Sequence, residues 1–213
     1  MFKSNEVIKN RRVKKSMKQS NETQSNHNYD ERSEQIKWAA LKVFAHRGIV
    51  GTKMSMIAAE AGISQGLSYR YFNSKEELFT ILVEEAMEEA QAAIKSILHL
   101  SVTPIQQIRT LTIRMLDESH QQFFLLLQHA QKSDEVPAAA KHIIEHYSAK
   151  DTIDQLIPIF IKGQQAGEFC KGDPYKLLFL YFSVISGLML QNVQIDEGYW
   201  LQEVDNLMKI LTK

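Results

Sequence analysis

The chain has few of the residues that cross-link chains or interrupt helices. It contains one cysteine, Cys170, which excludes an internal disulfide and a secreted disulfide framework. Four prolines and nine glycines are too few for a turn-rich all-β sandwich and favour long helices. The most apolar stretch, residues 177–190, is shorter than the roughly 20 residues that a membrane span needs. No apolar run of signal-peptide length follows the first lysine, so we expect a cytoplasmic protein without a membrane partner.

The chain also has no net charge, but this total hides a gradient along its 213 residues. Residues 1–30 and residues 31–75 each contain seven basic and three acidic side chains, whereas residues 76–213 contain 11 basic and 19 acidic ones. A basic front and an acidic rear are typical of a polyanion-binding domain joined to a different module. A chance imbalance between solvated faces gives the same totals, so charge alone does not decide between them.

Apolar residues recur at helical spacing, without strand alternation, an internal repeat or a glycine-rich phosphate loop. The first stripe begins at Ile36 and ends at Gly48, and Pro158 is expected to kink or interrupt a later helix. The other predicted helices cover residues 54–61, 64–72, 74–98, 104–117, 119–131, 137–148, 151–166, 174–192 and 199–211. The predicted fold class is therefore all-α.

The helices predicted at 54–61 and 64–72 are joined by a tight turn and have the proportions of a helix-turn-helix. Gly62 is suited to the left-handed residue that closes the first of them, and Ser64 is a good N-cap for the second. Because the first helix lacks a capping box, Thr52 or Ser55 is expected to cap it. A capping box at Ser74 begins the long helix that follows.

The outer arc of the second helix carries side chains suited to DNA. At about 100° per residue, Ser68 and Phe72 point inwards. Arginine can bind guanine through two atoms, glutamine suits adenine, leucine can contact the thymine methyl group, and tyrosine hydroxyls and lysine bind phosphates. Packing of Tyr69, Tyr71 and Phe72 against the next helix is the structural alternative. The outward residues are Gln65, Gly66, Leu67, Tyr69, Arg70 and Tyr71.

Residues 51–79, GTKMSMIAAEAGISQGLSYRYFNSKEELF, resemble the DNA-binding domain of the TetR family of transcriptional repressors. The resemblance covers about residues 32–80. It implies a homodimer whose last two helices pair with those of the partner, and a variable C-terminal domain that binds a small inducer. It also implies a set of DNA-facing residues: Ser55, Gln65, Gly66, Leu67, Tyr69, Arg70, Tyr71 and Lys75. The matching residues, in register, are Phe44, Gly48, Thr52, Ile57, Ala58, Ala61, Gly62, Ser64, Gly66, Tyr69, Tyr71, Phe72, Lys75 and Leu78.

Three parts of the chain follow from this. Residues 1–29 are a disordered basic arm that either tracks DNA or is only solvated, residues 30–76 are the helix-turn-helix domain, and residues 77–213 are the effector-binding and dimerisation domain. The predicted function is a dimeric, sequence-specific DNA-binding regulator, a repressor that a small molecule releases from its operator. We expect no cofactor and no enzyme activity. A helical protein-interaction adaptor is one alternative.

The C-terminal part contains two further sets of candidate residues. Residues 177–190 are apolar on every side, so a second subunit or an internal hairpin should cover them. The expected dimer interface comprises Leu180, Ser183, Val184, Gly187, Leu188, Trp200, Val204, Leu207 and Leu211. The candidate lining residues of an effector pocket are Met115, Phe123, Phe124, Leu127, Tyr147, Phe160 and Met189, although such residues are more often ordinary core than pocket wall.

The other alternative is a zinc hydrolase, because the segment HIIEH places His142 and His146 four residues apart with Glu145 beside them. Catalytic zinc also needs a third protein ligand and an open coordination position. His120 and His129 could contribute to a metal-sensing effector site. Histidines with water or backbone partners are commoner, so the expected metal site is none.

Overall fold

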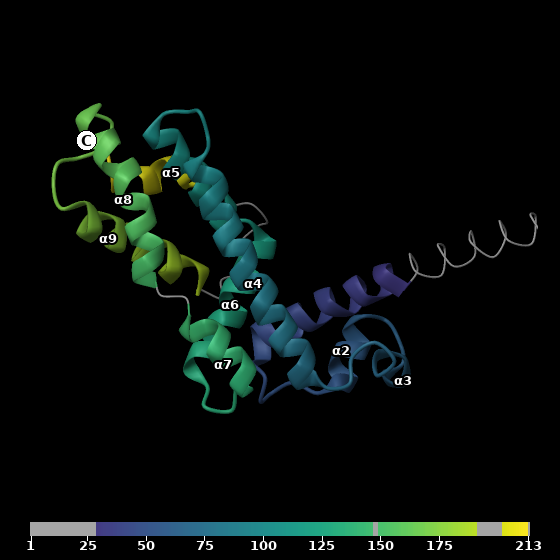
Figure 1. Ribbon diagram of the computed structural model, residues 1–213. Coiled ribbons are helices and arrows are strands. Elements are labelled where there is room, and N and C mark those ends of the chain that lie inside the picture. The colour runs from purple at the N-terminus through teal and green to yellow at the C-terminus, as the bar shows by residue number, and fades with distance from the viewer. Residues whose placement is uncertain (1–28, 147–148, 191–201, 213) are drawn as a thin grey trace, which may run out of the picture.

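The structure is a computed structural model that describes residues 29–146, 149–190 and 202–212, and all regular secondary structure in these ranges is helical, as predicted (Figure 1). A helix over residues 29–47 comes first. It is followed by α2 (Met54–Glu60), α3 (Gln65–Ser68), α4 (Lys75–Leu98), α5 (Pro104–Met115), α6 (Glu118–Lys132), α7 (Ala138–Glu145), α8 (Ala149–Gln165), α9 (Pro174–Met189) and α11 (Val204–Met208). The expected basic arm, apart from Tyr29, lies outside the described residues.

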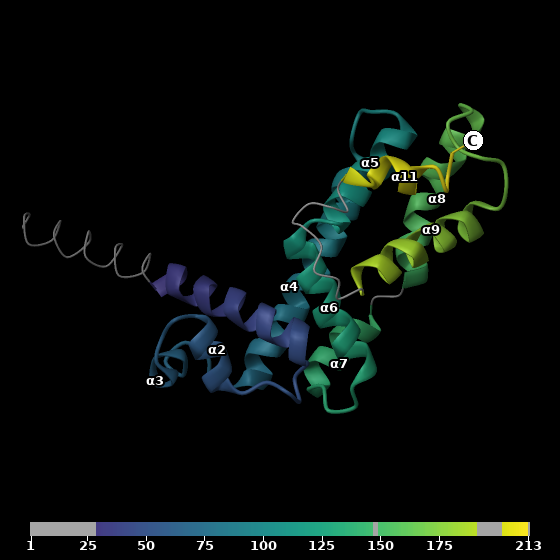
Figure 2. The same ribbon diagram turned by 180° about the vertical axis from the view of Figure 1, so that it is seen from behind.

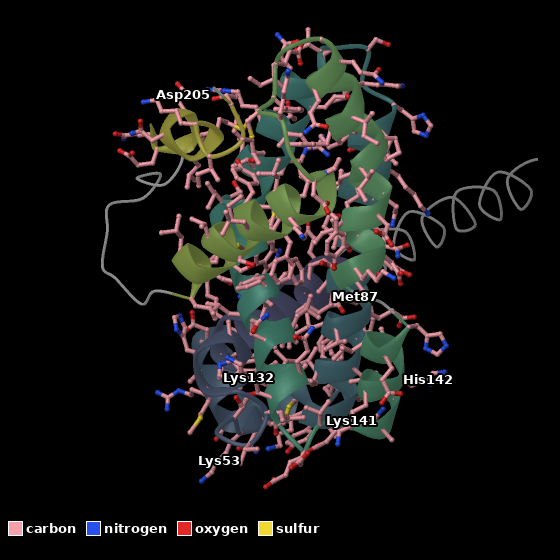
Figure 3. All side chains as sticks on the ribbon, turned by 90° about the vertical axis from the view of Figure 1, so that its left-hand side faces the viewer. Lys53, Met87, Lys132, Lys141, His142 and Asp205 are labelled. Carbon is pink, nitrogen blue, oxygen red and sulfur yellow. The ribbon has the colours of Figure 1, made fainter. Side chains whose placement is uncertain are left out.

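The long helix α4 connects two groups of helices (Figures 1 and 2). Its 24 residues correspond to about 36 Å of helix. The 29–47 helix, α2 and α3 lie at the start of α4, while α5, α8, α9 and α11 lie towards its other end. Figure 3 shows Met87 of α4 between the end of the molecule that carries Lys53 and the end that carries Asp205. A change at either end of α4 therefore has a direct physical route to the other.

The first hydrophobic core belongs to the helix-turn-helix but is not confined to it. Leu78, Leu82 and Val83 from the first half of α4 are buried in it, as are Leu126 of α6 and Ala140 of α7. The predicted boundary between residues 76 and 77 therefore falls within one continuous core. The buried members from the N-terminal helices are Ile36, Ala39, Ala40, Leu41, Phe44, Ile49, Met54, Ile57, Ala61 and Phe72.

The second core joins the last part of α4 to α5, α8, α9 and α11. The rings of Phe160 and Phe169 stack inside it, with centroids 4.5 Å apart and an interplanar angle of 3°. A Cβ atom at Gly163 would lie 2.3 Å from the Phe169 ring, so only glycine allows this close approach. Pro158 lies inside α8, which continues to Gln165 without interruption.

The predicted helix ends are correct in part. Ser74 Oγ accepts a hydrogen bond from the Glu77 backbone N–H (3.0 Å), as the capping box requires, but the Glu77 carboxylate accepts one from Asn73 N–H (2.7 Å). Thr52 is no N-cap, because its buried hydroxyl donates backwards to the Gly48 carbonyl (2.6 Å). Lys53 precedes α2, which has no side-chain cap. In the described ranges, no helix combines the length and apolar character needed to cross a membrane.

Candidate nucleic-acid interface

The turn between α2 and α3 is built as its sequence predicts. Gly62 has a φ of +64°, the left-handed conformation that closes a helix most easily at glycine. The Ile63 N–H then donates back to the Ala58 carbonyl at 2.9 Å. Ser64 caps α3, because its Oγ accepts a hydrogen bond from Leu67 N–H at 3.3 Å. These bonds fix the angle at which α3 leaves α2.

The segment predicted as one helix over 64–72 is regular α-helix only to Ser68 and then tightens. Arg70 N–H donates to the Leu67 carbonyl (3.0 Å), and Tyr71 N–H donates to the Ser68 carbonyl (3.1 Å). Ser68 and Phe72 are buried, as the helical spacing predicts. Tyr71 also packs against the first core, as the structural alternative expected, whereas Gln65, Gly66, Tyr69 and Arg70 are exposed.

Most of the predicted DNA-facing residues lie on this outer surface. Gln65, Gly66, Tyr69 and Arg70 are exposed, and Ser55 at the start of α2 is exposed as well. A Cβ atom at Gly66 would meet nothing within 4 Å, so a ligand can come close to the backbone there. Leu67 and Tyr71 are half-buried, and the Tyr71 ring stacks on Tyr29 with centroids 4.6 Å apart.

Lys75 has a contact that the sequence does not reveal. Its Nζ donates to the backbone carbonyls of Ile49 (2.8 Å) and Thr52 (2.9 Å), which lie in the loop that leads to α2. The residue is half-buried and is 4.0 Å from the Glu76 carboxylate. Lys75 therefore holds the helix-turn-helix in place, and its charge sits at the start of α4.

The basic residues of this domain differ in how their charge is balanced. Lys37 contacts the carboxylates of Glu34 and Glu85, both at 2.6 Å. Burial lowers the pKa of Lys37, but its hydrogen bonds with these two carboxylates outweigh that effect and raise the pKa above its usual value. Lys42 lies 3.9 Å from Glu60. These charges are balanced within the protein.

Four other cations have no such balance. No carboxylate of the described residues forms an ion pair with Arg32, Arg47, Lys53 or Arg70, and all four side chains are exposed. An exposed positive charge without an internal partner is available to a polyanion. Of these residues, the sequence predicted only Arg70 as a site residue. Charge pairing between helices depends on the fold, so no sequence pattern distinguishes Arg32 from Lys37.

The predicted effector-pocket residues divide between the two cores. Phe123 and Leu127 pack against the first core, whereas Met115 and Phe124 pack against the second. Phe160 and Met189 are buried within the second core, and Tyr147 lies outside the described residues. A separate cavity of about 70 Å³ lies beside α4, lined by Met87, Ala90, Gln91, Ile94, His146, Asp151, Thr152 and Gln155.

The predicted dimer residues on α9 face outwards. Leu180 is 54% exposed, Ser183 and Gly187 are exposed, and Val184 and Leu188 are half-buried. Phe179, which the prediction omitted, is also 54% exposed.

The other half of that prediction is corrected. Val204, Leu207 and Leu211 are at most 8% exposed, because they pack into the second core of their own chain. They cannot face a partner while the last helix stays docked. Trp200 lies outside the described residues.

Among the described residues, no three His, Cys, Asp or Glu side chains are arranged so that they could hold a metal ion. His142 and His146 are exposed, and their rings meet edge to face with centroids 4.2 Å apart. His120 lies between Glu89 (3.6 Å) and Asp117 (3.5 Å). His129 Nε2 is 3.1 Å from the Ala45 carbonyl oxygen, which connects α6 to the 29–47 helix.

These features define an all-helical protein with a helix-turn-helix at one end and a second helical core at the other. Residues 38–80 match the family model described as "Bacterial regulatory proteins, tetR family". Residues 38–80 are therefore similar to the DNA-binding domain of the TetR family, as the resemblance indicated.

The similarity to known proteins extends beyond residues 38–80. FasR of Mycolicibacterium smegmatis, an HTH-type transcriptional activator, is 27% identical over 130 residues, which are 60% of this chain and 59% of FasR. The solved structure of KstR2 of Mycobacterium tuberculosis, a ketosteroid transcriptional regulator, is 20% identical with a TM-score of 0.67, covering 85% of this chain and 95% of KstR2. AibR, solved in complex with isovaleryl coenzyme A and operator DNA, is 19% identical with a TM-score of 0.61, covering 84% and 97%. FasR and KstR2 are both named as regulators of transcription.

Proposed function

We propose that this chain is a dimeric regulator of transcription that binds operator DNA through α3 and the turn directly after it, residues 69–71. The observation that carries the proposal is the exposed, uncompensated charge of Arg70 on the outer face of a TetR-type helix-turn-helix. A regulator of this kind acts in the bacterial cytoplasm, where the chromosome is. The proposal extends to the whole chain, although the match to FasR spans only about three fifths of that relative's length.

The chemistry of the outer face suits the major groove of B-DNA. Arg70 can donate two hydrogen bonds to guanine O6 and N7, and Gln65 can pair with adenine. The Tyr69 hydroxyl can donate to a phosphate, while Gly66 lets the backbone approach closely. Leu67 is half-buried, so only the outer part of its side chain is available to a thymine methyl group. Ser55 lies at the start of α2, a second element that can approach the same groove.

A two-fold dimer supplies the second recognition helix. The outward face of α9 exposes Phe179 and Leu180, and the small residues Ser183 and Gly187 allow a second helix to come close. Two copies of α3 about 34 Å apart would enter successive major grooves on one side of the duplex. The operator should therefore be an inverted repeat.

A small effector would act through α4. The 70 Å³ cavity beside Met87 is much smaller than the roughly 300 Å³ of a typical small-molecule site, so an effector would have to move α8 away from α4. Movement of α4 displaces the first core, which contains the helix-turn-helix. A coupling free energy of about 1–3 kcal/mol is typical of such systems and is enough to release an operator.

We propose that the regulator represses transcription until the effector binds. The solved AibR complex contains both classes of ligand, operator DNA and an acyl coenzyme A.

The test is selection of bound fragments from genomic DNA by the full chain, followed by footprinting. We expect an inverted-repeat footprint, a solution mass of two subunits, and release of the DNA by some member of a metabolite panel. If the protein retained all duplexes equally, or none, the proposal would be wrong. Stoichiometric zinc that is lost with His142 and His146 would instead support the hydrolase.

A further inference from the structure

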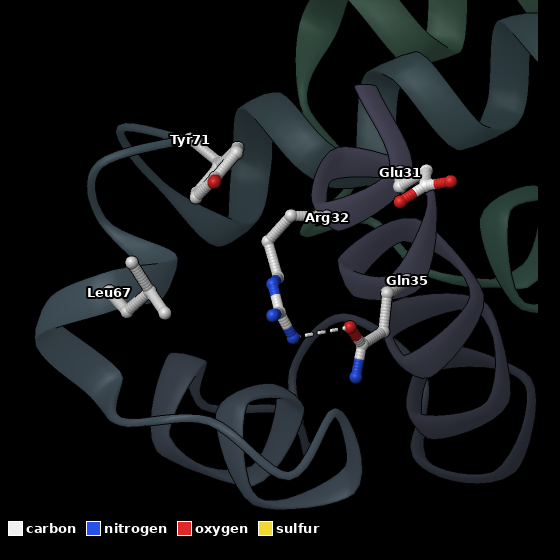
Figure 4. A pocket seen from close by; sticks show the side chains of 5 residues that line it. All are labelled: Glu31, Arg32, Gln35, Leu67 and Tyr71. Carbon is white, nitrogen blue, oxygen red and sulfur yellow. Dashed lines mark hydrogen bonds between the residues drawn. The ribbon is translucent and has the colours of Figure 1, made fainter. Parts of the chain in front are cut away.

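We propose that Arg32 forms a second DNA-contact site. It binds a backbone phosphate of the DNA strand next to the bases that α3 contacts. This inference rests on the proposed function and adds a contact outside the helix-turn-helix itself. An open groove of about 480 Å³ separates the 29–47 helix from residues 65–71, here called the recognition segment. Its lining residues are Glu31, Arg32, Gln35, Leu67 and Tyr71 (Figure 4).

A relay of two hydrogen bonds fixes the Arg32 guanidinium. Its NH1 group donates to Gln35 Oε1 at 2.6 Å, and Gln35 Nε2 donates to the Ala61 carbonyl at 2.7 Å. Ala61 is the C-terminal cap of α2, directly before the turn into α3. The position of the guanidinium is therefore tied to the turn that sets the angle of α3. An arginine that is already ordered loses less conformational entropy when it binds a phosphate.

The charge of this guanidinium is not neutralised. Gln35 is a neutral partner and uses one N–H donor, which leaves donors in the planar fork that suits phosphate oxygens. No carboxylate within the described ranges pairs with Arg32. Glu31 also lines the groove, but Figure 4 shows its carboxylate on the helix side, away from Leu67 and Tyr71. A phosphate would therefore approach from the recognition side.

The opposite wall suits a deoxyribose strand. Leu67 gives an apolar contact, and Tyr71 is fixed by its stack on Tyr29 at 4.6 Å. When α3 enters a major groove, one strand of the duplex must pass along the flank of the recognition segment. The groove and its cation lie on that flank. The matched negative case is Lys42, a cation of the same helix that lies beside Glu60 instead (3.9 Å).

The experiment uses the full chain and an operator duplex that was selected with the wild-type protein. It compares the wild type with Arg32→Ala, Gln35→Met and the control Lys42→Ala. We expect Arg32→Ala to weaken binding about tenfold at 0.1 M salt, for the operator and for an unrelated duplex alike. The slope of log K against log salt should become shallower by about 0.9. Gln35→Met should weaken binding a few-fold with no change in slope, because the charge remains. Lys42→Ala should bind like the wild type. Thermal melts of each variant show whether the fold is intact.

A scan of single methylphosphonate substitutions then locates the phosphate. At one position, the methylphosphonate should weaken DNA binding by the wild type and leave DNA binding by the Arg32→Ala variant unchanged. The inference is overturned if the Arg32→Ala variant keeps the wild-type salt slope, or if no such phosphate position exists. It is also overturned if the Arg32→Ala variant loses affinity for the operator alone, because that result would indicate a base contact. If the wild type bound no duplex, the proposed function itself would fail. If the wild type and the Arg32→Ala variant bound DNA equally well, only the Arg32 site would fail.

Discussion

The outward faces of α3 and α9 are both exposed, yet they differ in chemistry. The outward face of α3 and of the turn that follows it carries Gln65, Tyr69 and the uncompensated Arg70. The face of α9 carries Phe179 and Leu180, each 54% exposed, with no charged side chain between them and Leu190. Unbalanced positive charge fits a polyanion, and a contiguous apolar surface fits another apolar surface. One chain therefore presents two surfaces that suit two different partners.

The inward faces of the same two helices are alike. Each buries one hydroxyl group whose hydrogen bonds are satisfied within the chain. Ser68 Oγ donates to the Gln65 carbonyl at 2.8 Å, and the Tyr181 hydroxyl lies 2.7 Å from Thr112 Oγ1. Both residues are fully buried. The two helices therefore differ in their outer surfaces rather than in how they are held.

The largest effect is expected from Leu180→Glu, which breaks the α9 side of the comparison. In a two-fold interface each substitution places two carboxylates in contact with apolar surface, so the dimer dissociation constant should rise by at least about 100-fold. Operator affinity should fall with it, because a monomer carries one recognition helix. Sedimentation and gel-shift titration measure the two effects. Ile113→Glu, on α5, is the control, because Ile113 is also exposed. A Leu180→Glu protein with the mass of two subunits would place the interface elsewhere.

Arg70→Ala breaks the α3 side and should leave the solution mass unchanged. Operator affinity should fall by about 1–3 kcal/mol, and base preference should relax at one position of each half-site. Gel-shift titrations with a set of single-base operator variants measure both. Arg109→Ala is the control, since Arg109 is an exposed arginine that pairs with Asp205 (3.0 Å). Wild-type affinity in the Arg70→Ala variant would show that the guanidinium does not reach the duplex.

Lys75→Ala separates charge from architecture on the DNA-binding side. It should weaken binding to all duplexes by a similar factor and flatten the salt slope by about one. It should also lower the free energy of unfolding by about 1–2 kcal/mol, because the Thr52 carbonyl loses the Lys75 donor and the Ile49 carbonyl keeps only the Thr52 N–H (3.3 Å). Lys95→Ala, an exposed lysine of the same helix, should change neither. Weaker binding with an unchanged salt slope would mean that Lys75 acts on the fold alone.

The sequence could predict what depends on local geometry. Gly62 and Ser64 act through their own backbone and their near neighbours, so the turn between α2 and α3 forms as expected. The burial of Ser68 and Phe72 follows from helical periodicity. The same spacing could not predict which of the outward residues are partly covered. Tyr71 is half-buried because it packs against the first core and because Tyr29, about 40 residues earlier in the chain, stacks on it.

Long-range pairing could not be predicted. The spacing of Val204 and Leu207 predicts an apolar helix face, which α11 has, whereas Leu211 lies in the turn after α11; periodicity does not say which surface covers these residues. That surface is in the same chain. Thr52 can donate backwards to Gly48 as easily as it can cap α2, because both are short-range options for a threonine. Whether Arg32 is paired depends on where the fold places the carboxylates, and none of those in the described residues forms an ion pair with it.

The smallest effect is expected from Tyr181→Phe, which tests the inward face of α9 without touching its outer surface. Loss of the hydroxyl removes its bond to Thr112 and its contact with Met208 Sδ (3.3 Å), so the free energy of unfolding should fall by about 1 kcal/mol at pH 7. Dimer mass and operator affinity should be unchanged.

The same residue predicts a pH dependence. Burial raises the pKa of Tyr181 to about 12, against a smaller lowering effect of the hydrogen bond with Thr112. In the unfolded chain the phenol ionises near its ordinary value of 10, so the raised pKa stabilises the fold fully below pH 10, and this contribution is lost as the pH rises to 12. Other groups also titrate in that range, so the quantity to measure is the difference in unfolding free energy between wild type and Tyr181→Phe. That difference should shift between pH 10 and 12 in favour of the variant. A constant difference for Tyr181→Phe would mean that its hydroxyl can ionise without disturbing the core.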